Sequence, residues 1–315
     1  MTYLNNILGT KYPIIQGGMA NIATGAFAAE CSNAGALGII AGGGMDAERL
    51  AAEIHACRAL TDKPFGVNLM LMNPHADEIA DMLVREGVKY VTTGAGSPGK
   101  YMDSWKAAGM TVMPVSASVT LAKRLVRDGA DLIIAEGTES GGHVGEMTTL
   151  TLLPQMVDAL DVPVVGAGGI ADGRQAACAF ALGACGIQIG TVLLATYECP
   201  IHDNYKAAIL KAKDNGTTVT GRSVDAPVRI IKNRMAREYL KKERAGATRD
   251  ELETYTLGSL RKAVFDGNTE EGSLMSGQVC GQIKAIRHVD EVFRSLMEEA
   301  GRTAAALPGI MEDLS

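Results

Sequence analysis

The 315-residue sequence lacks the features of several specialised protein classes. Aromatic residues make up only 4% of it, without the interleaving of aromatic and basic residues common in nucleic-acid-binding proteins. The six cysteines and five histidines form no C-x-x-C or H-E-x-x-H pattern, which argues against a metal site and a disulfide framework. The longest uncharged run, residues 175–197, is broken by glycines and predicts helix, turn and strand rather than a membrane span.

The composition is otherwise that of a globular protein. Apolar residues make up 47% of the chain and charged residues 21%, which excludes a disordered chain. The first residues show no basic stretch followed by an apolar one, so the sequence predicts no secretory leader and a cytoplasmic location. Glycine is abundant, at 37 residues without a triplet repeat, which indicates tight turns and close approach of the main chain to a ligand.

Short, nearly continuous apolar runs alternate with helical patterns along most of the chain. Such runs are typical of parallel strands that are covered on both faces. The predicted strands are residues 14–17, 37–41, 65–71, 90–94, 111–116, 132–136, 162–167 and 186–191. Helix starts are predicted at Asp46, Asn73, Ser97, Ser118 and Asp172, and helix ends at Gly35, Gly87, Gly109, Gly129 and Gly183. Eight strand–helix units in series predict an α/β fold, a (β/α)₈ TIM barrel, rather than an open sheet.

The pattern changes after the eighth predicted strand. Residues 1–200 are predicted to form the barrel domain, completed by about 276–315, with a closing helix and a frayed end. Residues 204–275 read as a helical cap on the substrate side. Residues 204–244 carry eleven basic and four acidic side chains, although the whole chain has a net charge of −6. This basic segment indicates either steering of an anionic partner or an ordinary solvated surface; nucleic acid is disfavoured.

Two glycine-rich segments follow the seventh and eighth predicted strands, where barrels commonly bind phosphate. Gly168, Gly169, Gly190 and Thr191 would leave backbone N–H groups open to a dianion, or would merely form turns. Asp172 is interpreted as a helix cap rather than a ligand.

Other polar residues are predicted near the same end of the barrel. His143 lies between glycine pairs, where its imidazole can donate a hydrogen bond or a proton near neutral pH. Glu136 orients either a ligand or the loop, and Glu139 is expected to be solvated. Asn68 interrupts an apolar strand and needs a partner, either a ring with exocyclic carbonyls or an internal backbone contact, because an unpaired amide costs about 1–3 kcal/mol.

Methionines near strand ends have two interpretations. Their flexible thioether side chains suit acyl chains of different lengths, and they equally suit filling of the core. The residues concerned are Met19, Met70, Met72, Met113, Met147 and Met275.

Eight motifs together resemble one known family. They are residues 12–20, 63–68, 91–96, 136–143, 167–173, 188–191, 228–233 and 275–278. The chain resembles the FabK-type, FMN-dependent enoyl-acyl-carrier-protein reductases of bacterial fatty-acid elongation, within the nitronate monooxygenase-like barrel superfamily. The similarity covers roughly residues 10–285. Residues 66–68, 92–96 and the segment around Lys232 and Asn233 favour the reductase over its relatives.

The resemblance implies a role for each motif. It implies that the barrel binds FMN and that His143 is the active-site histidine. The cofactor-binding residues that it implies are Gly18, Met19, Ala20, Asn68, Glu136, Gly142, Ala167, Gly168, Gly169, Gln188, Gly190, Thr191, Met275, Ser276 and Gln278. No metal ligands are implied.

The resemblance also implies the reaction. NADH is the expected reductant, a trans-2-enoyl group on acyl carrier protein is the expected substrate, and activation by a monovalent cation and a homodimer are usual in similar enzymes. Two alternatives remain open: nitronate oxidation or NADH:quinone reduction by the same superfamily, and a non-enzymatic flavin-binding protein.

Overall fold

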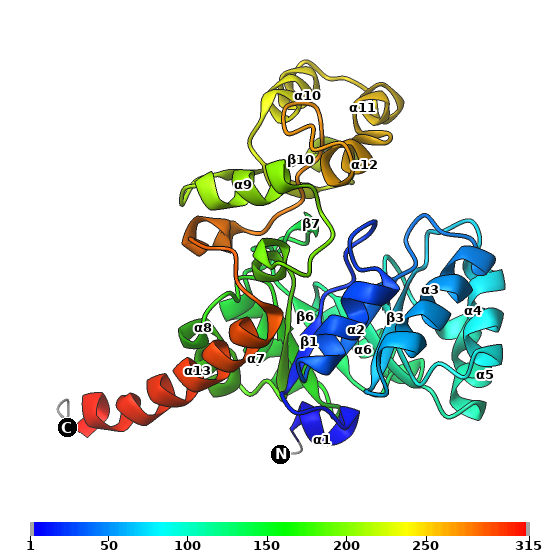
Figure 1. Ribbon diagram of the computed structural model, residues 1–315, viewed down its shortest axis with the longest axis vertical. Helices are drawn as coiled ribbons and strands as arrows, with labels where there is room; N and C mark the ends of the chain where they lie inside the picture. The colour runs from blue at the N-terminus through cyan, green and yellow to red at the C-terminus, as the bar shows by residue number, and fades with distance from the viewer. Residues whose placement is uncertain (1–2, 313–315) are drawn as a thin grey trace.

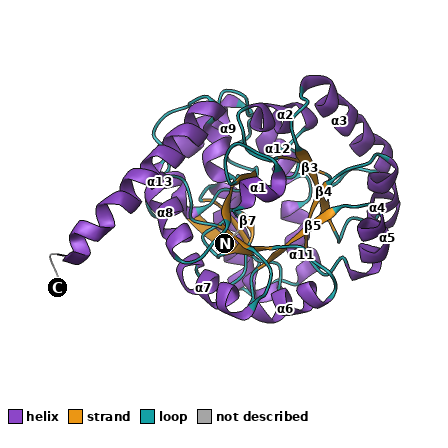
Figure 2. Ribbon diagram, turned by 90° about the horizontal axis from the view of Figure 1, so that it is seen from below, coloured by secondary structure: helices purple, strands orange, loops and turns teal. Residues whose placement is uncertain are grey.

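A computed structural model describes residues 3–312 of the protein. Eight parallel strands form a ring that is surrounded by helices (Figures 1 and 2). The strands are β1 (Ile14–Gln16), β2 (Gly38–Ala41), β3 (Phe65–Met70), β4 (Tyr90–Gly94), β5 (Thr111–Ser116), β6 (Ile133–Glu136), β8 (Val164–Ala167) and β9 (Gly186–Ile189). Their order is β1-β9-β8-β6-β5-β4-β3-β2, and a parallel bridge between Ile15 and Leu37 joins the two ends. The predicted TIM barrel is therefore confirmed, with strand boundaries close to those predicted.

The interior of the barrel is filled by apolar side chains and closed at its amino-terminal end by α1 (Leu4–Leu8). Leu4 and Leu8 are fully buried in the same cluster as strand residues such as Ile39. The Leu4 N–H donates to the Cys185 carbonyl at 2.9 Å, and the Tyr90 hydroxyl donates to the Leu8 carbonyl at 2.9 Å. With this end sealed, a ligand can enter the barrel only from the carboxyl ends of the strands.

The outer layer is formed by helices that follow the strands. They are α2 (Gly25–Asn33), α3 (Ala47–Leu60), α4 (Ala76–Arg85), the short η1 (Gly99–Tyr101), α5 (Met102–Ala107), α6 (Val119–Arg127), α7 (Thr149–Ala159) and α8 (Gly173–Ala181). Asp46, Ser118 and Asp172 cap α3, α6 and α8 as predicted. The start predicted at Asn73 is wrong, because the Asn73 amide is buried and donates instead to the Gly42 and Met45 carbonyls. The start predicted at Ser97 is one residue early: Pro98 is the N-cap of η1, although the Ser97 hydroxyl accepts from the Gly99 N–H at 3.2 Å.

The eighth outer position is filled by a helix that comes from the end of the chain. After β9 only η2 (Thr191–Ala195) follows before the chain leaves the barrel, and α13 (Val289–Glu312) later packs beside α8. A Cβ on Gly173 would lie 2.4 Å from the Ala300 nitrogen, so glycine permits this close packing. Figure 1 shows α13 extending beyond the barrel. Residues 313–315 of the predicted frayed end lie outside the described residues.

The cap stands over the carboxyl ends of the strands (Figure 1). Its elements are α9 (Asp203–Lys211), β10 (Thr217–Thr220), η3 (Arg222–Val224), β11 (Val228–Ile231), α10 (Arg234–Arg244), α11 (Arg249–Thr256) and α12 (Ser259–Val264), and η4 (Gln278–Gln282) follows on the return to the barrel. The predicted helical cap is confirmed by its four α-helices, and it also contains an antiparallel hairpin of β10 and β11 that the sequence did not predict. Their β-branched residues favour strands. Within residues 3–312, no helix combines the length and apolar character needed to cross a bilayer.

Candidate active site

A cavity of about 530 Å³ opens at the carboxyl ends of the barrel strands, beneath the cap. All the predicted site residues line it except Ser276 and Gln278. Ser276 is buried behind the wall, whereas the Gln278 side chain is exposed. The Gln278 N–H donates to the Glu139 carbonyl at 2.9 Å, so this residue holds the returning segment against the loop after β6. The volume is within the range of small-molecule sites.

The loops after β8 and β9 present open main-chain donors to this cavity. The N–H groups of Gly168, Gly169, Gly190 and Thr191 donate to no acceptor among residues 3–312. Gly168 and Gly169 have φ angles of 87° and 73°, which side chains rarely adopt. A Cβ on Gly168 would lie 2.8 Å from the Gly137 carbonyl oxygen. These four amides, the amide cradle, have the character of an anion site.

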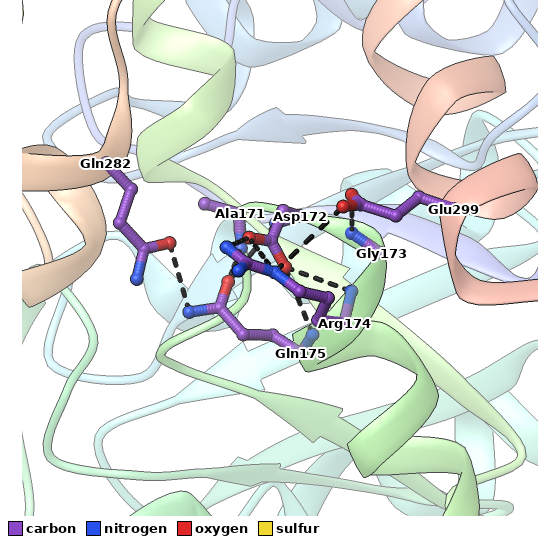
Figure 3. A network of polar contacts seen from close by, with 7 residues as sticks. All are labelled: Ala171, Asp172, Gly173, Arg174, Gln175, Gln282 and Glu299. Carbon is purple, nitrogen blue, oxygen red and sulfur yellow. Dashed lines mark hydrogen bonds and ion pairs between the residues drawn. The ribbon is translucent and has the colours of Figure 1, made fainter. Parts of the chain in front are cut away.

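The first turn of α8 is already satisfied by the protein itself (Figure 3). Asp172 accepts from the N–H groups of Arg174 at 3.0 Å and Gln175 at 3.2 Å, which confirms its interpretation as a cap. Glu299 of α13 accepts from the Gly173 N–H at 2.8 Å. An anion in the cavity would therefore be held by the loop amides and not by the amino terminus of α8.

An unpartnered hydroxyl group lines the same cavity. The Ser140 Oγ is buried and has no hydrogen-bond partner among the described residues; the Ser276 Oγ is also unpartnered but lies behind the wall. Buried polar atoms are almost always paired, so the unpaired Ser140 hydroxyl on the cavity wall indicates a polar ligand or ordered water. Together with the amide cradle and the largely apolar walls, this hydroxyl fits FMN, whose phosphate needs donors and whose ring needs apolar surface.

The Asn68 amide has a hydrogen-bond partner within the protein, but this partner is a side chain and not a backbone group. Its Nδ2 donates to the Thr92 Oγ1 at 2.9 Å, across the β3–β4 pair. Its Oδ1 accepts no hydrogen bond within the described part of the chain and stays available to a donor on a ligand. A Cβ on Gly18 would lie 2.7 Å from the Asn68 Cβ, so glycine keeps β1 close to this amide.

Glu136 is the last residue of β6 and lines the cavity. In the sheet it is paired with Ala167 of β8, which is paired in turn with Gln188 of β9. No basic group lies within ion-pair distance of its carboxyl group among residues 3–312. Burial raises the pKa of Glu136 to about 7, and a weak interaction with the nearby Ser140 hydroxyl opposes this effect. The side chain is therefore close to half-protonated at neutral pH and can both donate and accept hydrogen bonds.

The raised pKa of Glu136 predicts that the stability of the folded protein depends on pH. A carboxyl group with a raised folded-state pKa stabilises the protein when protonated, so stability falls as the pH rises from about 4.5 to 7. The isosteric Glu136→Gln variant should lack this loss, which amounts to about 3 kcal/mol at most. Urea denaturation of both apoproteins at pH 5 and pH 8 measures it. An equal pH dependence in the two proteins would contradict the assignment.

His143 lies on a short strand, β7 (Gly142–His143), that the sequence did not predict. In the register with the cap strand β11, His143 pairs with Val228, and the Val144 N–H donates to the Pro227 carbonyl at 3.2 Å. The imidazole is exposed to the cavity, yet desolvation by its surroundings lowers its pKa. The lowered pKa favours the neutral imidazole, which can act as a hydrogen-bond donor without being a cation.

The sequence missed a buried cation that joins the cap to the loop before β7. Arg229 of β11 is 6% exposed, and its Nε donates to the Thr138 carbonyl at 3.0 Å while Nη1 donates to the Thr217 hydroxyl at 3.2 Å. Burial lowers its pKa. The expectation that Glu139 is solvated is wrong, because its carboxylate accepts from the Thr149 N–H at 3.0 Å and from its hydroxyl at 3.0 Å. It thus caps α7.

Part of the remaining wall is apolar and was also missed as a site. It is formed by Gly94, Ala95, Gly96, Val115, Ala117, Leu121, Val144 and Gly145. The positive φ of Ala95, 63°, had no sequence signal. Among the methionines, Met19, Met70 and Met275 line the cavity, whereas Met113 is buried in the barrel and Met72 is 64% exposed.

Comparison with known proteins places this geometry in a family. A model of the nitronate monooxygenase family matches residues 1–89 and 76–299. The chain belongs to this family. A 5-hydroxy-7a-methyl-1-oxo-octahydro-1H-indene-4-carboxyl-CoA dehydrogenase of Mycobacterium tuberculosis is 31% identical over 97% of this chain and 98% of its own. A probable nitronate monooxygenase of Staphylococcus saprophyticus is 32% identical over 88% of this chain and 91% of its own.

Among solved structures, FabK from Thermotoga maritima is similar along nearly the whole chain. It is 42% identical, covers 98% of this chain and 99% of its own, and superposes with a TM-score of 0.95. This nitronate monooxygenase family member is therefore an oxidoreductase of the group that includes FabK.

Proposed function

We propose that the protein reduces trans-2-enoyl thioesters carried on acyl carrier protein, with NADH as reductant and FMN as resident cofactor. The observation that carries this proposal is the 42% identity to FabK over 98% of the chain, with the amide cradle and His143 on one cavity. Nitronate oxidation shares the fold and the cofactor, so the substrate must be distinguished by experiment.

The cavity supplies groups for both ends of FMN. The amide cradle would hold the phosphate dianion, and the Ser140 hydroxyl on the cavity wall is an additional donor. The Asn68 Oδ1 would accept from the ring system. When bound, FMN would take a hydride from NADH and pass it to the β-carbon of the enoyl group.

His143 would act on the thioester oxygen. Addition of hydride to the β-carbon moves negative charge onto this oxygen, and a fixed donor stabilises that charge. The lowered pKa favours the neutral imidazole, which still has one N–H to donate. Its pairing with β11 fixes the backbone of the loop that carries it.

Anaerobic reoxidation separates the candidate functions. The FMN-loaded protein is reduced with one equivalent of NADH without oxygen and is then mixed with crotonyl-CoA. Recovery of the oxidised flavin absorbance together with butyryl-CoA formation supports the proposal. If the oxidised flavin absorbance returns only when oxygen is added, and the protein turns over a propyl nitronate, the function is nitronate oxidation and the proposal is wrong.

A dehydrogenase of a saturated CoA ester is a second candidate, which the Mycobacterium tuberculosis relative favours. That relative is named as a dehydrogenase of a carboxyl-CoA compound, and a dehydrogenase of a CoA thioester would take hydride from its substrate rather than deliver it. Reduction of oxidised, FMN-loaded protein by butyryl-CoA in the absence of NADH would identify this activity.

The cap offers basic side chains for an acidic carrier protein. Arg237, Lys241 and Arg244 on α10 are exposed and form no ion pair with the described acidic residues. Arg249, by comparison, pairs with Glu253 at 3.0 Å on α11. Unpaired charges of one sign steer an oppositely charged partner and raise its association rate.

This arrangement predicts a salt-dependent reaction with carrier-bound substrate. For crotonyl-acyl carrier protein, kcat/KM should fall by about tenfold or more between 50 and 500 mM NaCl, because screening weakens steering. Arg237→Glu combined with Lys241→Glu should flatten this dependence, and the matched Arg249→Glu variant should not. A salt response unchanged by the double variant would remove α10 as the docking surface.

A further inference from the structure

The cavity is chemically divided between two sides of the barrel. Most polar groups lie at the ends of β6, β8 and β9, where Glu136 and the amide cradle are found, and Asn68 adds one amide on β3. The ends of β4 and β5, with the start of α6, form a wall without a charged or hydrogen-bonding side chain. We call this wall the β4–β5 sector; it consists of Gly94, Ala95, Gly96, Val115, Ala117, Leu121, Val144 and Gly145.

The β4–β5 sector lies away from the amide cradle. In the strand order, β4 and β5 are separated from β8 and β9 by β6 on one side and by β3, β2 and β1 on the other. The β4–β5 sector is therefore not needed for the phosphate end of the cofactor. It adjoins the catalytic loop directly, since Val144 follows His143 in the chain.

The side chains of the β4–β5 sector suit a chain of methylene groups. Gly94, Ala95, Gly96 and Ala117 are small and leave room, while Val115, Leu121 and Val144 supply apolar surface. Each buried methylene group contributes about fourfold to affinity. No side chain in this wall would hydrogen-bond a polar substituent, so a polar or charged ligand group would lose most of its hydration there with little compensation.

Gly94 has a particular position in this wall. It ends β4 opposite Met70, and a Cβ placed on it would meet no atom within 4 Å. Its φ lies outside the left-handed region, whereas Gly96 has a φ of 137°. A side chain at position 94 would thus enter open cavity without straining the backbone. Because Gly94 has no side chain, this part of the β4–β5 sector stays open.

We propose that the β4–β5 sector is the subsite for the unbranched acyl chain of the thioester and that Gly94 sets the chain length it accepts. This inference rests on the proposed function, from which it takes the thioester as ligand. The acyl chain would extend along β4 and β5 from a thioester group beside His143.

The test compares short and long substrates in a Gly94→Leu variant. We expect kcat/KM for crotonyl-CoA to stay within about threefold of the wild type and that for 2-dodecenoyl-CoA to fall at least about thirtyfold, because several methylene groups lose their contacts. Gly301→Leu is the matched control, since Gly301 lies on α13 away from the cavity and its added Cβ also meets nothing within 4 Å. An equal effect on both substrates, or none, would overturn the proposal.

A second variant and a binding measurement keep the test decisive. Leu121→Ala enlarges the same sector and should raise the ratio of dodecenoyl to crotonyl reduction, even if Gly94→Leu does not fold. Calorimetric binding of butyryl-CoA and dodecanoyl-CoA to the FMN-loaded protein requires no turnover. If the wild type reduces neither enoyl substrate, the proposed function fails; if Gly94→Leu leaves the ratio of the two affinities unchanged, the subsite fails.

Discussion

Replacing His143 with alanine should slow reduction of crotonyl-CoA by about 10²–10³-fold, because the charge on the thioester oxygen loses a positioned donor. Reduction of the flavin by NADH should change less, since no oxyanion forms in that step. Stopped-flow absorbance under anaerobic conditions measures the two half-reactions separately. FMN content should remain that of the wild type, because the amide cradle does not include this residue.

His75→Ala is the matched control for this experiment. His75 precedes α4 on the outside of the barrel and does not line the cavity. Its removal should leave both half-reactions unchanged. If His143→Ala also leaves both rates unchanged, the imidazole has no role in the chemistry and the donor must be sought elsewhere on the cavity wall.

The second large effect is expected at Gly168. A methyl group there would lie 2.8 Å from the Gly137 carbonyl oxygen and would require a side chain to adopt a φ of 87°. The loop must shift, which misplaces the amides of Gly168 and Gly169. A charge-assisted hydrogen bond contributes about 1.5–3 kcal/mol, so Gly168→Ala should weaken FMN binding by about a hundredfold or more. Quenching of FMN fluorescence by the apoprotein reports the affinity.

Gly87→Ala separates this effect from simple backbone strain. Gly87 also has a positive φ, 62°, but an added Cβ would meet nothing within 4 Å, and the residue lies outside the cavity. This variant should lose about 1–2 kcal/mol of stability and bind FMN normally. Comparable FMN affinities in the two variants would show that the amide cradle does not hold the cofactor.

Much of the barrel and part of the cavity follow from local sequence patterns. Buried parallel strands read as apolar runs, and glycines such as Gly129, with a φ of 106°, mark helix ends because only glycine takes this conformation readily. The amide cradle was recognisable for the same reason. Asp172 was identified as a cap because capping depends on residues a few positions apart.

Contacts between distant segments could not be predicted in this way. β7 has two residues and no periodicity, and it becomes a strand only because β11 pairs with it. Arg229 appeared in the sequence as one of many cap charges, and its burial follows from the same pairing. The β4–β5 sector has no signature either, because small and aliphatic residues are as common in a core as in a binding wall.

The edge of β11 that faces away from β10 has a consequence for how this enzyme can diversify. This one edge holds His143 through Val228 and also meets Met275 through Ile230. Replacing or shortening the cap to admit a different substrate would therefore displace both His143 and part of the cavity wall. New substrate specificities should arise more readily from single substitutions at the carboxyl ends of the barrel strands than from replacement of the cap.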